Sequence, residues 1–190
     1  MKVAVIGQGY VGQTIAFYAA QNHDVVGFDL NLELVNELNS GITRIEGLDS
    51  DLLTDSLKNG TYQATNNPNL INGADIVVIA VPTPLDANRK PDLSFIKKAC
   101  ETIGKNLKNQ ALIINESTSY PGTVRNFIKP LLEVLSPNIK HLYAVSPERV
   151  DPGRLDWNQT NTPRLYSGLT IKASEETAKF YGSFCSNLVE

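Results

Sequence analysis

The stretch VAVIGQGYVG, residues 3–12, decides the fold. Its apolar, β-branched start at 3–6 predicts a buried parallel strand. Three glycines follow at the spacing of a phosphate-cradling turn, and residues 11–22 then show helical periodicity. A second strand is expected at 24–28, and it ends in an acid, Asp29. A lone GxGxxG would be weak support, but strand, turn, helix and acid-tipped strand together predict a dinucleotide-binding unit.

Strands and helices alternate along the rest of the chain. Further strands are expected at 61–65, 74–81, 111–115 and 141–145, and helices at 31–39, 51–58, 68–72, 92–107, 122–135 and 173–188. Such alternation implies a parallel sheet covered by helices on both faces. The fold class predicted is α/β, a doubly wound parallel sheet (Rossmann fold) in a single domain, followed by the start of a linking helix.

Composition excludes several classes of protein. Of the 190 residues, 42% are hydrophobic and 19% charged, which is typical of a globular domain. The net charge of -3 and the absence of a basic stripe argue against nucleic-acid binding. Cys100 and Cys185 are too far apart for paired metal ligands, and His23 and His141 have no companion ligands, so no metal is expected. No stretch looks like a signal peptide or a membrane span, so the protein is expected to be cytoplasmic.

Each residue of the glycine-rich turn has an expected role. Gly7 makes the tight turn, Gly9 lets the backbone approach a pyrophosphate, and Gly12 lets the helix pack against the strand. Tyr10 and Val11 open the helix, whose N–H groups and dipole face the phosphates. The alternative is a glycine-rich turn without a ligand, and the surrounding pattern favours the binding role.

Asp29 predicts which dinucleotide binds. It lies 17 positions after Gly12, close to the usual place of the acid that accepts hydrogen bonds from a ribose diol. Its carboxylate would repel a 2′-phosphate, and no Arg or Lys follows it nearby. The sequence therefore predicts NAD rather than NADP. Asp29 could also cap the helix that begins near Asn31, and both roles are compatible.

Three polar loops follow predicted strands and should meet at one sheet edge, where ligands bind in such folds. They are Val81-Pro82-Thr83-Pro84, Glu116-Ser117-Thr118 and the run from Ser146 to Gly153. Taken singly, each loop has a purely structural explanation. The prolines of the first would fix the end of a strand, a hydroxyl of the second would cap a helix, and Glu148 and Arg149 of the third would form a surface ion pair. Taken together beside the glycine-rich turn, they predict a site in which Glu148 is a general acid or base.

These motifs resemble the UDP-glucose/GDP-mannose dehydrogenase family, the nucleotide-sugar 6-dehydrogenases. The resemblance covers about the first 165 residues and is carried by GQGYVG (7–12), Asp29, VPTPLD (81–86), RKPDLS (89–94), ESTSYPGTV (116–124) and SPERVDPG (146–153). The stretch TPRLYSG (162–168) matches the family only loosely. The loop PERVDPG is closer to the members that act on UDP-N-acetylhexosamines. The UDP-glucose enzymes more often carry another glutamate downstream in this loop, whereas this sequence has Pro152.

The resemblance implies NAD-dependent oxidation of a sugar C6 alcohol to a carboxylate in two hydride transfers. It assigns Thr118 to holding the catalytic water, Glu148 to acid–base catalysis, and Glu148 with Arg149 to substrate binding. It also implies cofactor contacts by Val81, Pro82, Thr83, Ser117 and Thr118, in addition to those of the glycine-rich turn and Asp29.

The resemblance also implies missing parts. The family's nucleophilic cysteine, in a GFGG-x-Cys segment, and its catalytic lysine and asparagine have no counterpart in these 190 residues. We therefore expect an NAD-binding domain at 1–170, a C-terminal helix at 171–190 and no catalytic-cysteine, UDP-binding domain. Such a chain would be a piece of a longer, homodimeric protein, and would bind NAD without oxidising a UDP-sugar.

Two alternatives stay open. A stand-alone module that senses NAD or NADH would not need the Thr118 and Glu148 motifs. A hydroxyacyl-CoA or phosphogluconate type of dehydrogenase would not need the PERVDPG loop.

Overall fold

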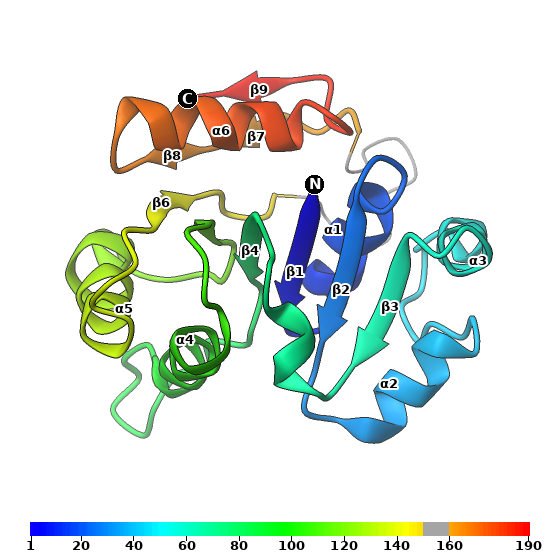
Figure 1. The fold of residues 1–190 in the computed structure, drawn as a ribbon, viewed down its shortest axis with the longest axis horizontal. Coiled ribbons are helices and arrows are strands. Elements are labelled where there is room, and N and C mark those ends of the chain that lie inside the picture. The colour runs from blue at the N-terminus through cyan, green and yellow to red at the C-terminus, as the bar shows by residue number, and fades with distance from the viewer. Residues whose placement is uncertain (150–159) are drawn as a thin grey trace.

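Six parallel strands and one antiparallel strand form the central sheet of the computed structural model, which describes residues 1–149 and 160–190 (Figure 1). The strand order is β3-β2-β1-β4-β5-β6-β8, with β8 antiparallel to β6. This confirms the predicted doubly wound sheet. The strands are β1 (Lys2–Ile6), β2 (Asp24–Phe28), β3 (Tyr62–Thr65), β4 (Ile76–Ile79), β5 (Leu112–Asn115), β6 (Leu142–Val145) and β8 (Ser167–Gly168).

Helices cover both faces of this sheet, because successive side chains of a strand point to opposite sides. Val3 and Val5 of β1 pack in a core cluster with α1, α2, α3 and α6, whereas Ala4 and Ile6 pack in a second cluster with α4 and α5. The helices are α1 (Tyr10–Ala19), α2 (Leu32–Asn39), α3 (Ser50–Lys58), α4 (Ser94–Asn106), α5 (Lys129–Leu135) and α6 (Ile171–Tyr181), with short turns η1 (Pro68–Ile71) and η2 (Val124–Ile128).

The strand order creates a crevice between β1 and β4. From β1 the chain runs through α1 to β2 and on to β3, and then crosses back to β4 on the other side of β1. The connections after β1 and β4 therefore leave the sheet in opposite directions at their carboxyl ends. Ligands of open α/β sheets bind in the crevice at such a point.

The end of the chain differs from the prediction. The helix expected at 173–188 was wrong at its carboxyl end, because α6 stops at Tyr181 and Gly182 caps it. The chain then turns and forms β9 (Leu188–Val189), which pairs in parallel with β7 (Arg164–Leu165). Two-residue strands such as β7, β8 and β9 are too short to show a periodicity, so the sequence did not reveal them.

The helix expected at 122–135 also differs, because its first part is not regular α-helix. Residues Val124–Ile128 are π-helical, and the α-helix begins only at Lys129. Pro130 has no N–H to donate to the preceding turn, which disfavours a continuous ladder of helical hydrogen bonds through this point.

None of the helices in the described parts of the chain combines the length and the apolar character that crossing a membrane would require.

The helix α4 should contribute strongly to stability through Ile103, whose side chain is 0% exposed. Replacing Ile103 by Ala should lower the free energy of unfolding by about 2–5 kcal/mol, because it leaves a cavity in a packed core. The matched control is Val134→Ala on α5, where the side chain is 77% exposed and the change should stay within about 0.5 kcal/mol. Urea unfolding measures both, and similar losses in the two variants would contradict this packing.

Candidate functional site

The turn between β1 and α1 depends on the absence of two side chains. Gly7 has a φ of +93°, and a Cβ atom there would lie 2.6 Å from the carbonyl oxygen of Ala80. A Cβ atom on Gly12 would lie 1.8 Å from the carbonyl oxygen of Gly7. Glycine is therefore required at both positions, for the turn and for the close approach of the helix. Both positions agree with the roles expected from the sequence.

Gly9 is open toward solvent, unlike Gly7 and Gly12. It is the N-cap residue of α1, and no side chain caps the helix there. A Cβ atom on Gly9 would meet no protein atom within 4 Å. The backbone of Gly9, directly before α1 begins at Tyr10, is thus exposed. A diphosphate fits this place, because a helix N-terminus presents N–H groups and the positive end of its dipole.

Asp29 connects the end of β2 to the glycine-rich turn. Its Oδ2 accepts a hydrogen bond from the backbone N–H of Gln8 at 2.8 Å, and its Oδ1 accepts one from Asn31 N–H at 2.9 Å. The N-cap of α2 is Asn31, whose own side chain accepts from Glu33 and Leu34. Asp29 is therefore not the capping residue, and its half-buried carboxylate is fixed at the crevice.

A pocket of about 320 Å³ opens beside Asp29. Gly7, Asp29, Val81 and Pro82 line it from the carboxyl ends of β1, β2 and β4, and Phe95 and Lys98 are among the residues that line it from α4. Mostly apolar walls with few polar groups are typical of a pocket for a small organic group. Thr83 is half-buried directly after the pocket residues.

The Ser117 hydroxyl binds the backbone just after β4 and does not point into solvent. Its hydroxyl accepts from Val81 N–H at 3.0 Å and donates to the Val81 carbonyl at 2.8 Å. The side chain is buried, whereas the next residue, Thr118, is exposed. The predicted contact of Ser117 with a cofactor thus stays a prediction, and the structure adds a role in holding Val81 at the pocket.

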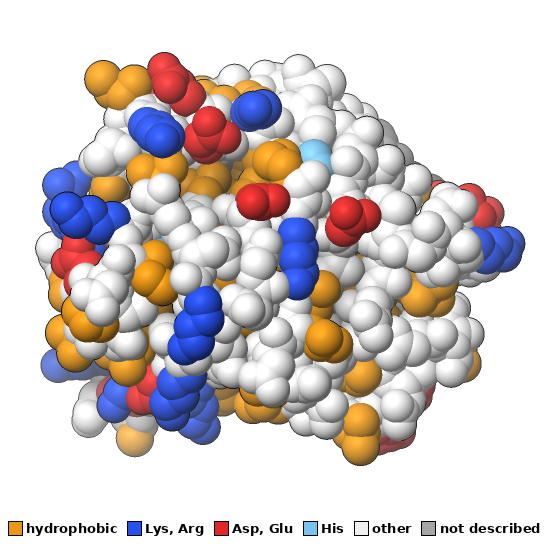
Figure 2. Space-filling view, in the orientation of Figure 1, with side chains coloured by type: hydrophobic (Ala, Val, Ile, Leu, Met, Phe, Trp, Pro, Cys, Tyr) orange, Lys and Arg blue, Asp and Glu red, His pale blue; other side chains and the backbone are white. Residues whose placement is uncertain are grey.

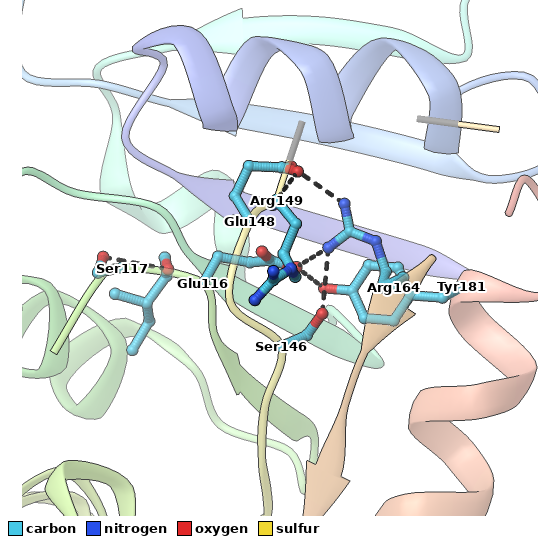
Figure 3. A network of polar contacts seen from close by, with 8 residues as sticks. Glu116, Ser117, Ser146, Glu148, Arg149, Arg164 and Tyr181 are labelled. Atoms are coloured by element: carbon cyan, nitrogen blue, oxygen red, sulfur yellow. Dashed lines mark hydrogen bonds and ion pairs between the residues drawn. The ribbon is translucent and has the colours of Figure 1, made fainter. Parts of the chain in front are cut away.

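A buried arginine organises the next part of the sheet edge (Figure 3). The side chain of Arg164, on β7, is 3% exposed. It donates from Nη1 to Glu116 Oε1 at 2.7 Å and from Nη2 to Glu148 Oε2 at 3.0 Å. Nη1 also reaches Ser146 Oγ at 3.1 Å, and the guanidinium lies 4.5 Å from the ring centre of Tyr181. The Tyr181 hydroxyl donates to the same Glu116 oxygen.

Burial shapes the protonation of this cluster. Loss of solvent raises the pKa of the fully buried Glu116 to about 7, although Arg164 opposes the shift by favouring the charged form. The negative charge of Glu148 raises the same pKa further. Burial, together with the charge of Glu116, also raises the pKa of Tyr181, which therefore stays a neutral donor.

The structure brings some predicted residues together and adds others. Glu148 pairs with Arg164, and its Oε1 accepts from the backbone N–H of Arg149, whose own side chain is exposed. Residues 150–153 of the predicted PERVDPG loop lie outside the described residues. Glu116, Arg164 and Tyr181 were given no role from the sequence. A charged residue directly after the buried strand 112–115 was the available signal for Glu116.

Positively and negatively charged side chains are interspersed on the surface. Figure 2 shows one face of the molecule, on which Lys and Arg side chains gather mostly on the side of α4 and α5 and are interspersed with Asp and Glu. This face offers no uniform basic stripe of the kind that tracks a nucleic-acid backbone.

The strand order, the glycine-rich turn and the fixed acid at the crevice define a dinucleotide-binding Rossmann domain. Residues 1–185 match the NAD binding domain of the UDP-glucose/GDP-mannose dehydrogenase family, and the chain belongs to this family. The cofactor of the matched domain is NAD, which confirms the predicted cofactor.

Several relatives share both sequence and fold. Protein CapL of Staphylococcus aureus is 35% identical over 96% of this chain, and UDP-N-acetyl-D-glucosamine 6-dehydrogenase of Pseudomonas aeruginosa is 34% identical over 95%. The solved structure of UDP-D-ManNAc dehydrogenase from Pyrococcus horikoshii superposes with a TM-score of 0.93 at 33% identity and covers all of this chain. The chain spans 43% of each of the first two proteins and 47% of the solved chain, thus less than half of their lengths.

Glu116 should make the stability of the protein depend on pH. Its carboxyl binds a proton more tightly in the folded state than in the unfolded chain, because its pKa rises from 4.5 to about 7 on folding. Its contribution is therefore complete below about pH 4.5 and is lost as the pH rises through about 7. Between about pH 5 and about pH 8, wild type should lose on the order of a few kcal/mol relative to Glu116→Gln, which cannot titrate.

Urea unfolding at several pH values measures this difference. Glu175→Gln is the matched control, because Glu175 is exposed on α6 and should leave the pH dependence of wild type unchanged. Parallel pH profiles for wild type and Glu116→Gln would contradict the raised pKa.

Proposed function

We propose that this chain is the NAD-binding part of a nucleotide-sugar 6-dehydrogenase, which oxidises the C6 alcohol of a UDP-sugar to a carboxylate with two NAD. The observation that carries the proposal is the buried pair of Glu148 and Arg164 at the sheet edge that also holds the glycine-rich turn. A module that only senses NAD or NADH has no use for an acid held in place at the carboxyl edge of its sheet, whereas a dehydrogenase needs one to move protons.

The residues of the crevice fit NAD in an extended pose. The diphosphate would lie over Gly9 and the first turn of α1, at Tyr10 and Val11. The hydroxyls of the adenosine ribose would donate to Asp29, and the adenine would occupy the pocket beside Val81 and Pro82. Thr83, Ser117 and Thr118 follow β4 and β5, on the way to the far end of the cofactor. NAD, when bound, accepts hydride from the sugar carbon.

The catalytic side chains of this part are Glu148 and Thr118. Glu148 would exchange protons with the substrate or with water as a general acid or base, since its carboxylate is held but 10% exposed. Thr118 is exposed one residue beyond the clamped Ser117, where its hydroxyl can hold a water. Arg149 is exposed and would contact the anionic substrate together with Glu148.

The substrate class is a UDP-N-acetylhexosamine. The names of several relatives support it, because they include UDP-N-acetyl-D-glucosamine and UDP-N-acetyl-D-mannosamine dehydrogenases. We propose that residues 1–170 bind NAD and that 171–190 lead to a further domain of a longer, cytoplasmic and homodimeric protein. That domain would supply a cysteine nucleophile and most of the UDP-sugar site. This chain by itself should then bind NAD without producing NADH from UDP-sugars.

Calorimetry with NAD and NADP tests the cofactor site. NAD should bind at least about tenfold more tightly than NADP, a difference of about 1.4 kcal/mol, because a 2′-phosphate would lie against the Asp29 carboxylate. Equal affinities would contradict the place of the ribose. Production of NADH from a UDP-N-acetylhexosamine by the 190-residue chain would contradict the need for a further domain.

Asp29→Ala should weaken NAD binding by about 1–3 kcal/mol, the scale of lost hydrogen bonds to a charged group. Asp24→Ala is the matched control, since Asp24 is exposed at the opposite end of β2. Asp29→Asn separates the two roles of this residue, because it keeps an acceptor for one backbone N–H and removes the charge. Unchanged NAD affinity in Asp29→Ala would remove this residue from the site.

A further inference from the structure

The carbonyl oxygens of the glycine-rich turn are bound by two buried side-chain amides. Gln8 Nε2 donates to the carbonyl oxygens of Val5 and Gly7 at 3.0 Å and 3.1 Å. Gln13 Nε2, from α1, donates to the carbonyl oxygen of Gln8 at 2.8 Å. Gln8 and Gln13 are 0% and 1% exposed, so their amide oxygens need partners as well as their nitrogens.

A hydroxyl group binds the oxygen of each amide. Tyr62, on β3, donates to Gln8 Oε1 at 2.9 Å. Thr43, in the connection between α2 and α3, donates to Gln13 Oε1 at 2.6 Å. Burial raises the pKa of Tyr62, and the charge of Asp29 raises it further, so this hydroxyl stays protonated. Because a carbonyl oxygen can only accept, the nitrogen of the Gln13 amide must face the Gln8 carbonyl and its oxygen must face Thr43.

These amides fix the direction of two successive peptide units. The N–H and C=O groups of a planar trans peptide point in opposite directions. In the peptide between Gly7 and Gln8, the amide of Gln8 binds the carbonyl, and the N–H on the other side donates to Asp29 Oδ2 at 2.8 Å. In the next peptide, Gln13 binds the carbonyl of Gln8, so the N–H of the exposed Gly9 points away from Gln13.

We propose that Gln13 is a positioning residue for the diphosphate of NAD, and that Thr43 holds its amide in the required orientation. By binding the Gln8 carbonyl, Gln13 turns the N–H of Gly9 outward, and outward N–H groups of a turn bind anions. Without this bond the peptide would be free to rotate and to bring its carbonyl oxygen toward the phosphates, which repel it. This inference rests on the proposed position of the diphosphate over Gly9.

Binding of ADP and of adenosine to the 190-residue chain tests this role, because only ADP carries a diphosphate. Gln13→Met keeps a long side chain and removes the amide. In this variant ADP and NAD should bind about tenfold more weakly than in wild type, the effect of one lost hydrogen bond to a charged group. Adenosine affinity should be unchanged, whereas a general loss of packing would weaken both ligands alike. NMR titrations of backbone amide signals measure all three affinities.

Gln21→Met is the matched control for the loss of a glutamine amide. The Gln21 amide also donates to a backbone carbonyl, that of Phe17 at 3.2 Å, but it lies beyond the opposite end of α1. Gln21→Met should therefore leave the ratio of ADP affinity to adenosine affinity as it is in wild type.

Thr43 provides a milder pair of variants, because it is only half-buried and lies outside the helices. Thr43→Val removes the hydroxyl that binds Gln13 Oε1, so it should weaken the binding of ADP and leave that of adenosine unchanged. Thr43→Ser keeps the hydroxyl and should restore the ADP affinity of wild type.

Equal weakening of ADP and adenosine in Gln13→Met, or unchanged ADP affinity in this variant, would overturn the proposal. If Gln13→Met does not fold, the Thr43 variants decide, and equal ADP affinity in Thr43→Val and wild type would overturn it. A wild type that binds ADP no more tightly than adenosine would contradict the proposed position of the diphosphate, and the role of Gln13 with it. Failure of the Gln13 role alone leaves the wild-type preference for ADP intact, so the two failures can be told apart.

Discussion

The contact between α1 and the turn before it is the constraint on which the rest of this structure depends. Gly12 sits so close to the carbonyl of Gly7 that no side chain fits between them, and Gly7 itself needs a positive φ beside Ala80. These two absences let the helix begin directly at the end of β1. Because the helix starts there, its N-terminus faces the crevice between β1 and β4, and Asp29 can bind the backbone of Gln8 from the neighbouring strand.

A second constraint acts on the other side of the crevice. Arg164 joins the ends of β5 and β6 through Glu116 and Glu148, and it packs on the ring of Tyr181 from α6. Buried ion pairs are weak contributors to net stability because of the desolvation they require. Here the arrangement fixes the position of the Glu148 carboxylate, which is 10% exposed at the end of β6.

The sequence was informative where a pattern repeats or where a residue type has one physical use. Alternating buried strands and amphipathic helices predicted the sheet, and the glycines at 7 and 12 predicted the turn, because only glycine fits there. The contacts of Arg164 with Glu116, Glu148 and Tyr181 were not predicted. Arg164 lies on a two-residue strand and Tyr181 on the last turn of a helix, and both are far in sequence from Glu116. Their meeting depends on the antiparallel return of β8 and on the packing of α6, which no local pattern reveals.

A crystal structure of this chain with NAD tests the central claim most directly. The account predicts the diphosphate over Gly9 at the start of α1, both hydroxyls of the adenosine ribose on the Asp29 carboxylate, and the adenine in the pocket against Val81 and Pro82. A crevice that remains empty at saturating NAD, or a cofactor bound with its ribose away from Asp29, would contradict it.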